Sequence, residues 1–407
     1  MGDCWAEGAD AVVLGLDAGT TSAKALVVSR AGQVLAEGVS DAIVTRTTAD
    51  GGNEQDPGDI WRAVTTAGRR AVQALAGDVR VAALAVAAQS GSVIPVLHGD
   101  RADRTITWMD ERSEPLVNSW APETVTTIRE LSGWAPSSGV GLSTIAWLRS
   151  LEAGSGTDRY PAVAKWASVD DYLVFGLTSR WATNPSNAAG MQLMDVSSRT
   201  WSTELCRIAG MQTRALSPIC EPATVVGGLT SDAASALGLD AGTPVVVGGH
   251  DQACAALGLG VTEPGEAFLS AGTAWVLTVV TDSADVGALP PALNLSPHVV
   301  PGRWTASENL GGLGAMLAEA PEAAIGSSFE SCARSVRDCL EAVAGLAAGG
   351  GALTMVGGGI RFDGLADAIA DAIGGPVVAR GEAPWPAVGA ARLAGIALGW
   401  TQWDDAA

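Results

Sequence analysis

The feature that most constrains the fold is a pair of short apolar strands joined by a glycine turn near the N-terminus. Residues 11–17 (AVVLGLD) form an apolar run that ends in a carboxylate, a pattern typical of a buried strand. A tight turn follows at 18–21 (AGTT), and residues 22–29 return as a second strand. P-loop and Rossmann folds place a helix directly after their glycine turn. The strand found here instead predicts a β-meander, and therefore a different fold class.

The same pattern occurs again in the second half of the chain. Residues 267–280 (AFLSAGTAWVLTVV) predict a strand, an Ala-Gly-Thr turn and another strand. An Ala-Gly-Thr tripeptide alone is a weak signal in a chain rich in Ala and Gly. The strands on both sides of each turn strengthen it, and the two hairpins predict a duplicated domain that holds phosphate from two sides.

The rest of the chain alternates between helical and strand patterns, which predicts a mixed α/β fold. With 407 residues and a hydrophobic fraction of 47%, more than one core is expected. We expect two domains, residues 1–228 and 229–407. Further strands are expected at 34–38, 81–87, 94–97 (continuing the first sheet), 243–249, 352–356 and 377–378, and helices at 57–75, 145–151, 169–177, 232–237, 365–373 and 388–398, with a helix or turn at 252–258.

Charge and composition exclude several classes of function. The net charge of −20 repels nucleic acid and anionic lipid, so neither is expected as a partner. Phosphate must then be bound by a local device, such as backbone N–H groups or a metal ion. Six cysteines without a close pair, and three histidines, disfavour a disulfide framework or a zinc site. Without a signal-peptide pattern or a membrane-length apolar run, we expect a cytoplasmic protein.

The first hairpin carries groups suited to phosphoryl transfer. Asp17 ends the first strand, and Gly19, Thr20 and Thr21 supply a turn rich in N–H and hydroxyl donors. Glycine lets the backbone approach a phosphate closely, because it has no Cβ. Lys24 begins the next strand, from where it could reach a phosphate oxygen. The alternative is an ordinary hairpin with a solvated Asp and Lys.

A second candidate is the tract Gly248-Gly249-His250-Asp251-Gln252, at the end of the strand expected over 243–249. The two glycines before Asp251 have no side chains that would crowd its carboxylate, so a substrate could contact it closely. An aspartate in such a place can accept the proton of a substrate hydroxyl during phosphoryl transfer. The alternative is an aspartate that caps the following helix.

Two further tracts have weaker signals. Gly357-Gly358-Gly359 follows an apolar strand and could lie flat against a purine, or form a flexible turn. The tract 108–112 (WMDER) offers an aromatic face beside polar groups, which suits a sugar ring. Its alternative is a salt-bridged surface turn.

In this order, these tracts resemble the FGGY carbohydrate kinases, a branch of the actin, Hsp70 and hexokinase superfamily. The resemblance covers most of the chain. The matching tracts are LGLDAGTTSAKALV, NEQDPGDIW, TWMDER, DYL followed by LTSRWATNPSNAAGMQLMD, VVVGGHDQACAALGLG, FLSAGTAWVL and MVGGGIRFDGLADAIADAIGGPV.

The resemblance implies two RNase H-like domains with the active site in the cleft between them, and ATP and Mg²⁺ as cofactors. Asp251 would be the catalytic base, and Asp17 would help to hold Mg²⁺ together with Asp251. Phosphate or nucleotide would be bound by Gly19, Thr20, Thr21, Lys24, Gly272, Thr273, Gly357 and Gly358, and the sugar by Gln89, Ser90, Trp108, Asp110, Asp251 and Gln252.

The chain also departs from the family. Xylulose kinases usually carry Met-His, and glycerol kinases Arg-Glu, where this chain has Gln89-Ser90-Gly91. The GHDQ and W-x-D-x-R tracts are more similar to the xylulose kinases. The stretch between Thr273 and Gly357 is shorter than in typical members, which predicts a trimmed second domain.

The leading hypothesis is a kinase for a small sugar or polyol. A ketopentose such as D-xylulose is the favoured substrate. The protein could form a homodimer. One alternative is a catalytically weak member that senses nucleotide or sugar. Another is an actin- or Hsp70-like ATPase with a protein client, which the sugar-side tract at Trp108 and Asp110 disfavours.

Overall fold

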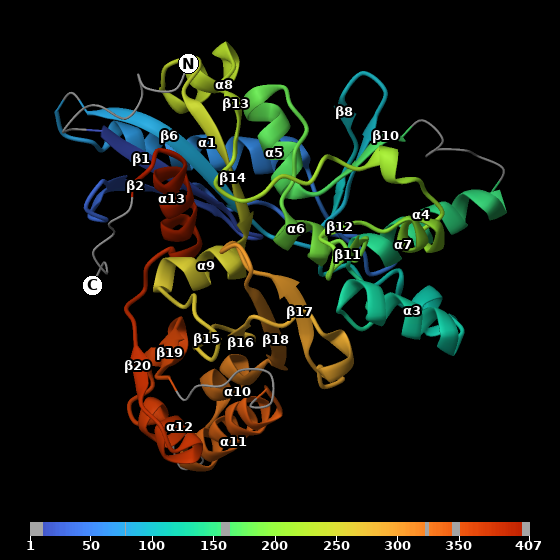
Figure 1. Cartoon of the computed structure of the whole chain (residues 1–407), viewed down its shortest axis with the longest axis vertical. Coiled ribbons are helices and arrows are strands. Elements are labelled where there is room, and N and C mark those ends of the chain that lie inside the picture. The colour runs from blue at the N-terminus through green and yellow to red at the C-terminus, as the bar shows by residue number, and fades with distance from the viewer. Residues whose placement is uncertain (1–10, 78, 156–162, 322–324, 344–350, 401–407) are drawn as a thin grey trace.

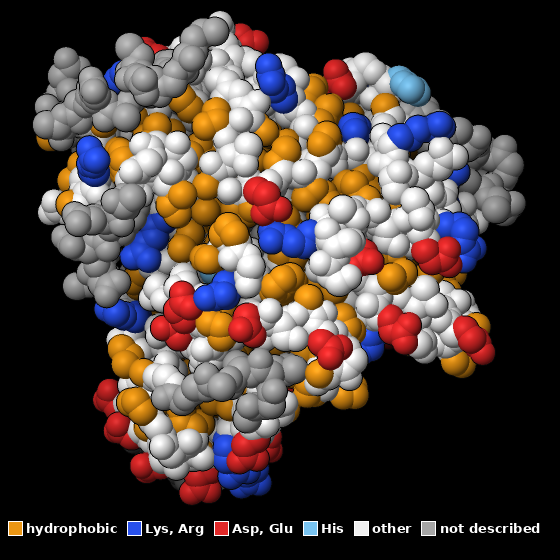
Figure 2. Space-filling view, in the orientation of Figure 1, with side chains coloured by type: hydrophobic (Ala, Val, Ile, Leu, Met, Phe, Trp, Pro, Cys, Tyr) orange, Lys and Arg blue, Asp and Glu red, His pale blue; other side chains and the backbone are white. Residues whose placement is uncertain are grey.

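Two six-stranded sheets organise the molecule, one in each half (Figure 1). The computed structural model describes residues 11–77, 79–155, 163–321, 325–343 and 351–400. None of the helices in these ranges has the length and hydropathy that a membrane span requires. Figure 2 shows acidic and basic side chains interspersed over the viewed face, including the tip formed by α11 (Ile325–Val343) and α12 (Leu365–Ile373).

The first sheet has the strand order β13-β14-β6-β1-β2-β3. It consists of β1 (Ala11–Ala18), β2 (Ala23–Ser29), β3 (Val34–Val39), β6 (Arg80–Ala88), β13 (Val225–Gly228) and β14 (Pro244–His250). Strand β1 pairs antiparallel with β2 and parallel with β6, and β14 pairs parallel with β6. The predicted β-meander is confirmed. On one face lie α1 (Pro57–Gln73), α5 (Val169–Thr178) and α8 (Ser231–Leu237), and on the other α9 (Asp251–Leu259) and α13 (Trp385–Ala397).

The second sheet repeats this arrangement, with the order β17-β18-β16-β15-β19-β20. Its strands are β15 (Ala267–Ala271), β16 (Trp275–Thr281), β17 (Asn294–Pro297), β18 (Trp304–Gly311), β19 (Leu353–Val356) and β20 (Val377–Ala379). Strand β15 pairs antiparallel with β16 and parallel with β19, as β1 does with β2 and β6. Helices α10 (Leu313–Glu319), α11 and α12 pack beside this sheet around a separate core. The second Ala-Gly-Thr hairpin therefore has the same strand context as the first.

A smaller region extends from the first sheet toward the right of Figure 1. Its helices are α2 (Glu114–Asn118), α3 (Pro122–Ser132), α4 (Gly141–Ser155), α6 (Pro185–Gly190) and α7 (Thr203–Ile208). Its strands are β4 (Arg46–Thr47), β5 (Asn53–Gln55), β7 (Ile94–Leu97), β8 (Arg101–Ala102), β9 (Thr105–Ile106), β10 (Val163–Ala167), β11 (Met194–Asp195) and β12 (Thr200–Trp201). Short 3₁₀ turns occur at Thr213–Ala215, Val286–Ala288 and Gly358–Arg361.

Two expectations from the sequence differ from the structure. Strand β7 does not continue the first sheet but pairs with β8 and β10 in a sheet of its own, because the chain turns at Gly91 with a φ of 84°. The expected boundary at 228/229 falls between β13 and β14, yet these strands pair with each other in the first sheet. The hairpin β17–β18 and helix α11 were not anticipated.

Glycines let α13 pack closely against β1 and α9. A Cβ placed on Gly15 would lie 2.0 Å from the Ala387 carbonyl oxygen, and one on Gly389 would lie 1.9 Å from the Cys254 carbonyl oxygen. Both neighbours are backbone atoms that cannot rotate away. Because α9 begins at Asp251, this packing also fixes the helix that carries the expected base.

We predict that Gly389→Ala destabilises the fold by about 1 to 3 kcal/mol, since an added methyl group overpacks the contact with α9. Urea denaturation measures the change in the free energy of unfolding. Gly326→Ala is the matched control, because no neighbouring atom of the described residues lies within 4 Å of its Cβ position in α11. Equal stabilities for the two variants would contradict the role of Gly389.

Candidate active site

A cavity of about 370 Å³ lies between the two sheets. One side is formed by the ends of β6 and β14 and the turn after β1, and the other by β16, β17 and β18. Six of the predicted site residues line it: Thr20, Gln89, Ser90, Trp108, Asp251 and Gln252. The parallel strands β1, β6 and β14 end at one edge of their sheet, and this is where α/β folds generally bind ligands.

Asp251 lies at the cavity as the first residue of α9. The N-cap of this helix is His250, and the cap has no side-chain hydrogen bond, so Asp251 is not the cap that the alternative interpretation proposed. Its Oδ1 lies 3.0 Å from Nε2 of His250. The two preceding glycines allow close packing: a Cβ on Gly248 would lie 1.9 Å from the Val86 carbonyl oxygen.

Asp17 is buried near Asp251 at the end of β1. Burial, together with the charge of Asp251, raises the pKa of Asp17 to about 7, while the charge of Lys24 opposes the shift. Its Oδ1 has no hydrogen-bond partner among the described residues. The alternative of a solvated Asp in an ordinary hairpin is therefore wrong for this carboxylate, whereas the Lys24 side of the hairpin is exposed.

The carboxylates of Asp17 and Asp251 fit a magnesium ion. Mg²⁺ commonly takes one or two protein carboxylates and fills its remaining positions with water and substrate phosphate oxygens. The unpartnered Oδ1 of Asp17 is an oxygen of the required kind. No cluster of three or more His, Cys, Asp or Glu side chains occurs in the described part of the chain, so further ligands would come from ATP and water.

A closed ring of hydrogen bonds joins the turn after β1 to the tract 108–112. The indole Nε1 of Trp108 donates to Oγ1 of Thr20 (2.9 Å), which donates to Oε1 of Gln89 (3.1 Å). Oγ of Ser92 also donates to Oε1 of Gln89 (3.3 Å) and accepts from the backbone N–H of Trp108 (3.2 Å). Nε2 of Gln89 is buried without a partner among the described residues. The ring leaves this amide group available to a ligand.

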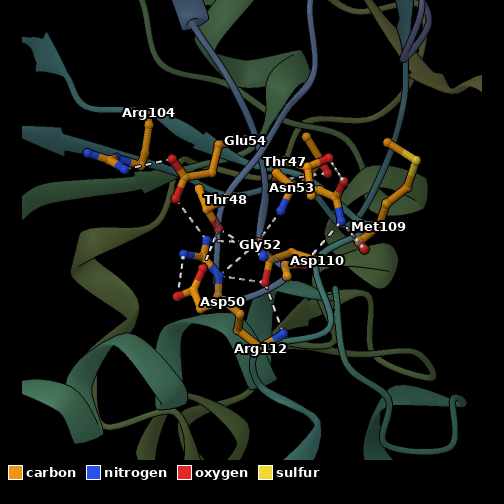
Figure 3. A network of polar contacts seen from close by, with 12 residues as sticks. Thr47, Thr48, Asp50, Gly52, Asn53, Glu54, Arg104, Met109, Asp110 and Arg112 are labelled. Carbon is orange, nitrogen blue, oxygen red and sulfur yellow. Dashed lines mark hydrogen bonds and ion pairs between the residues drawn. The ribbon is translucent and has the colours of Figure 1, made fainter.

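Asp110 lies outside the set of residues that line the cavity, although the sequence predicted it as a substrate ligand. Its Oδ2 accepts hydrogen bonds from Nη2 of Arg112 (2.7 Å) and from the backbone N–H of Asn53 (2.8 Å). Arg112 also donates to Glu54 (Figure 3). Its guanidinium carbon lies 4.6 Å from the ring centroid of Trp147. The Asp110 carboxylate thus has an observed role in holding the loop that carries Trp108.

A chain of buried polar side chains, which the sequence analysis missed, holds the backbone of the tract 248–252. The backbone N–H of His250 donates to Oγ of Ser186 (2.9 Å), and Ser186 donates to Oδ1 of Asn184 (2.7 Å). Nδ2 of Asn184 donates to Oδ2 of Asp170 (3.1 Å). The sequence signal was present in the tract TNPSNA, but it does not show which strand end the tract contacts.

Four of the predicted nucleotide residues gather at the turn of the second hairpin, outside the cavity lining: Gly272, Thr273, Gly357 and Gly358. Gly272 and Thr273 are exposed between β15 and β16. Gly357 has a φ of 91°, and a Cβ there would lie 2.9 Å from the Ala271 carbonyl oxygen, so the Gly357-Gly358 turn touches the Ala-Gly-Thr turn. Gly19, Thr21 and Lys24 also lie outside the cavity lining, beside Thr20.

The sequence analysis also missed the residues that the second sheet contributes to the cavity. Sequence reasoning assigned no role to Trp134 or to strands β17 and β18, because nothing in the local sequence marks them as site residues. The residues of the second sheet include Thr278, Asn294, Ser296, Ser307 and Asn309, and Trp134 joins them from the loop after α3.

Comparison with known proteins decides the family. A model of the N-terminal domain of the FGGY family of carbohydrate kinases matches residues 12–258, more than half of the chain. The chain belongs to the FGGY family. The predicted family membership is therefore confirmed, and FGGY members are carbohydrate kinases that transfer phosphate.

Among curated FGGY relatives is the autoinducer-2 kinase of Salmonella choleraesuis. It is 30% identical over 308 residues, covering 71% of this chain and 55% of the relative. The chain thus spans about half the length of that kinase.

Solved structures of sugar and glycerol kinases confirm the predicted two-domain fold. A ligand-bound xylulose kinase from Lactobacillus acidophilus superposes with a TM-score of 0.83 at 19% identity, covering 96% of this chain and 90% of the other. A glycerol kinase from Plasmodium falciparum with ADP gives 0.84 at 16%, covering 97% and 90%. Similarity at these identities establishes the actin/hexokinase-like fold and leaves the acceptor open.

We predict that Asp17→Asn stabilises the protein more at pH 8 than at pH 5 in magnesium-free buffer. The folded carboxyl ionises near pH 7, and the unfolded one near its ordinary value of 3.8. The folded state therefore binds more protons between these values, and stability falls as the pH rises through this window. Asparagine removes that loss, which we expect to be about 1 to 3 kcal/mol.

Urea denaturation at the two pH values measures this effect. The exposed Asp282→Asn serves as the control and should show no such pH dependence. A gain for Asp17→Asn that is the same at both pH values would contradict the assignment of the raised pKa.

Proposed function

We propose that this chain is an ATP-dependent kinase that phosphorylates a hydroxyl group of a small sugar or polyol, with Asp251 as the general base. One observation carries the proposal: the Asp251 carboxylate lines a cavity between two sheets and lies near buried Asp17. Each sheet also carries one Ala-Gly-Thr hairpin beside this region. Membership of the FGGY family also supports a kinase function.

The proposed reaction uses the side chains on both sides of the cavity. Asp251 accepts the proton of the acceptor hydroxyl while the oxygen of that hydroxyl bonds to the γ-phosphorus of ATP. The bond from the γ-phosphorus to the β–γ bridging oxygen breaks, and ADP leaves. Mg²⁺, when bound, neutralises charge on the phosphate oxygens. The turns at Thr20 and Thr273 donate hydrogen bonds to phosphate from opposite sheets, with Gly357 and Gly358 beside the nucleoside.

For the acceptor, we propose a ketopentose such as D-xylulose. The GHDQ tract and the tract at Trp108 support it, since both are similar to those of xylulose kinases. Gln89, Ser90 and Gln252 line the cavity beside Trp108 and would bind the sugar. Autoinducer-2 is a second candidate, because relatives about 30% identical carry the name of that kinase.

The weak nucleotide or sugar sensor remains the alternative. Asp17 and Asp251 argue against it, because a sensor needs neither a base nor a buried pair of carboxylates. A cytoplasmic location, where ATP is available, and a homodimer also remain predictions.

We predict that Asp251→Asn lowers kcat by about 100-fold or more, as expected for the loss of a general base. ADP release is measured with Mg-ATP against D-xylulose, other ketopentoses, aldoses, polyols and autoinducer-2. The exposed Asp371→Asn is the control and should retain wild-type turnover.

Two results would contradict parts of the proposal. Full turnover by Asp251→Asn would remove the base assignment. Binding of ATP and sugar by the wild type without any turnover would favour the sensor.

A further inference from the structure

One face of the second sheet presents a continuous set of uncharged polar side chains to the cavity. Thr278 on β16 pairs with Ser307 on β18, and Ser307 pairs with Asn294 on β17. Cross-strand partners point to the same side of a sheet, so these three side chains form one row. All three line the cavity, as do Ser296 and Asn309 in the neighbouring rows. We call these five residues the polar wall.

Thr278 gives the polar wall a buried hydroxyl group that lacks a hydrogen-bond partner in the described part of the chain. Its side chain is only 2% exposed, and its Oγ1 has no partner among the described residues. A buried hydroxyl without a partner is unfavourable, and native structures usually satisfy such groups with a partner or a ligand. Because Thr278 lines the cavity, a bound molecule can supply the missing partner.

The wall is held opposite the first sheet by contacts that bridge the two halves. Nε1 of Trp134 donates to Oγ of Ser296 (3.0 Å) and to the carbonyl oxygen of Leu295 (3.1 Å). The backbone N–H of Leu295 donates to the carbonyl oxygen of Gly133 (3.0 Å). These bonds fix β17 against the loop that follows α3, so a ligand can contact the wall and Asp251 at the same time.

The charges around the cavity restrict what can bind. Among the residues that the structure describes, no lysine or arginine lines it, and Asp251 is its one acidic lining residue, with His250 beside it. A carboxylate or phosphate group on the acceptor would therefore find no cation on the wall and would be repelled by a chain of net charge −20. Hydroxyl groups, in contrast, match amide and hydroxyl side chains.

We propose that the polar wall is the second half of the acceptor site, with Thr278 as a specificity-determining residue. It binds hydroxyl groups of an uncharged, polyhydroxylated acceptor at the end remote from the hydroxyl that Asp251 deprotonates. The inference rests on the proposed kinase function and extends it by assigning acceptor recognition to both domains. A site built to bind a hydroxyl rejects analogues that lack it, because its own polar group then stays unpaired.

The test is Thr278→Val, which removes the hydroxyl and keeps the shape. We expect KM for the acceptor to rise about tenfold, the size of one lost hydrogen bond, while KM for ATP and kcat stay near wild type. Thermal stability should be equal or higher, because the variant loses an unpaired buried hydroxyl. A merely structural role would lower stability and leave the acceptor KM unchanged, and that result would overturn the proposal.

Thr354→Val is the matched control. Thr354 and Thr278 both pair with Phe268, so they share one face of the same sheet, but Thr354 lies outside the cavity lining. This control should leave the acceptor KM unchanged. Ser307→Ala provides a second variant of the wall and should raise the acceptor KM as well. An unchanged KM in both wall variants would overturn the proposal.

The probes are D-xylulose, D-ribulose, xylitol and glycerol, with D-gluconate as the anionic comparison. Phosphorylation is measured together with binding, which isothermal titration calorimetry follows. Preference for D-gluconate, or no binding of any uncharged probe, would overturn the substrate class. Full activity of Asp251→Asn beside a raised acceptor KM in Thr278→Val would refute the proposed base and leave the wall assignment standing.

Discussion

The burial of the Asp17 carboxylate beside the charge of Asp251 is the constraint on which the rest of the site depends. Both carboxylates lie at one edge of the first sheet, and burial of Asp17 adds to the unfavourable energy of holding two negative charges together. Such a pair persists only where the surrounding structure fixes it. A divalent cation that carries phosphate would relieve the repulsion, which explains why the arrangement suits phosphoryl transfer.

Three separate supports hold these groups in place. The close contact between Gly389 and Cys254 fixes the helix that starts at Asp251, and the chain from Asp170 through Ser186 holds the backbone of His250. The network around Arg112 holds the loop that carries Trp108. Each support lies behind the cavity surface, so the side chains that face a substrate are fixed before it binds.

The two sheets share a strand pattern but contribute different chemistry. The first sheet supplies the acidic residues, with the indole of Trp108 beside them on the loop after β9, whereas the second supplies an uncharged polar wall and the glycine turns at Gly272 and Gly357. For the proposed kinase, this division would place the charged groups where phosphate is transferred and the neutral ones where hydroxyl groups can be recognised. Acceptor choice would then depend on both halves.

The sequence by itself determined the elements with strong local patterns: the two hairpins, most strands and helices, and Asp17 and Asp251 at strand ends. These depend on periodicity and turn chemistry between near neighbours. Only the tertiary structure decided that β7 leaves the first sheet, that β14 pairs within it, that Asp110 binds Arg112, and that Thr278 faces the cavity. The physical reason is that such contacts join residues far apart in the chain, whose pairing leaves no periodic signal in the sequence around either partner.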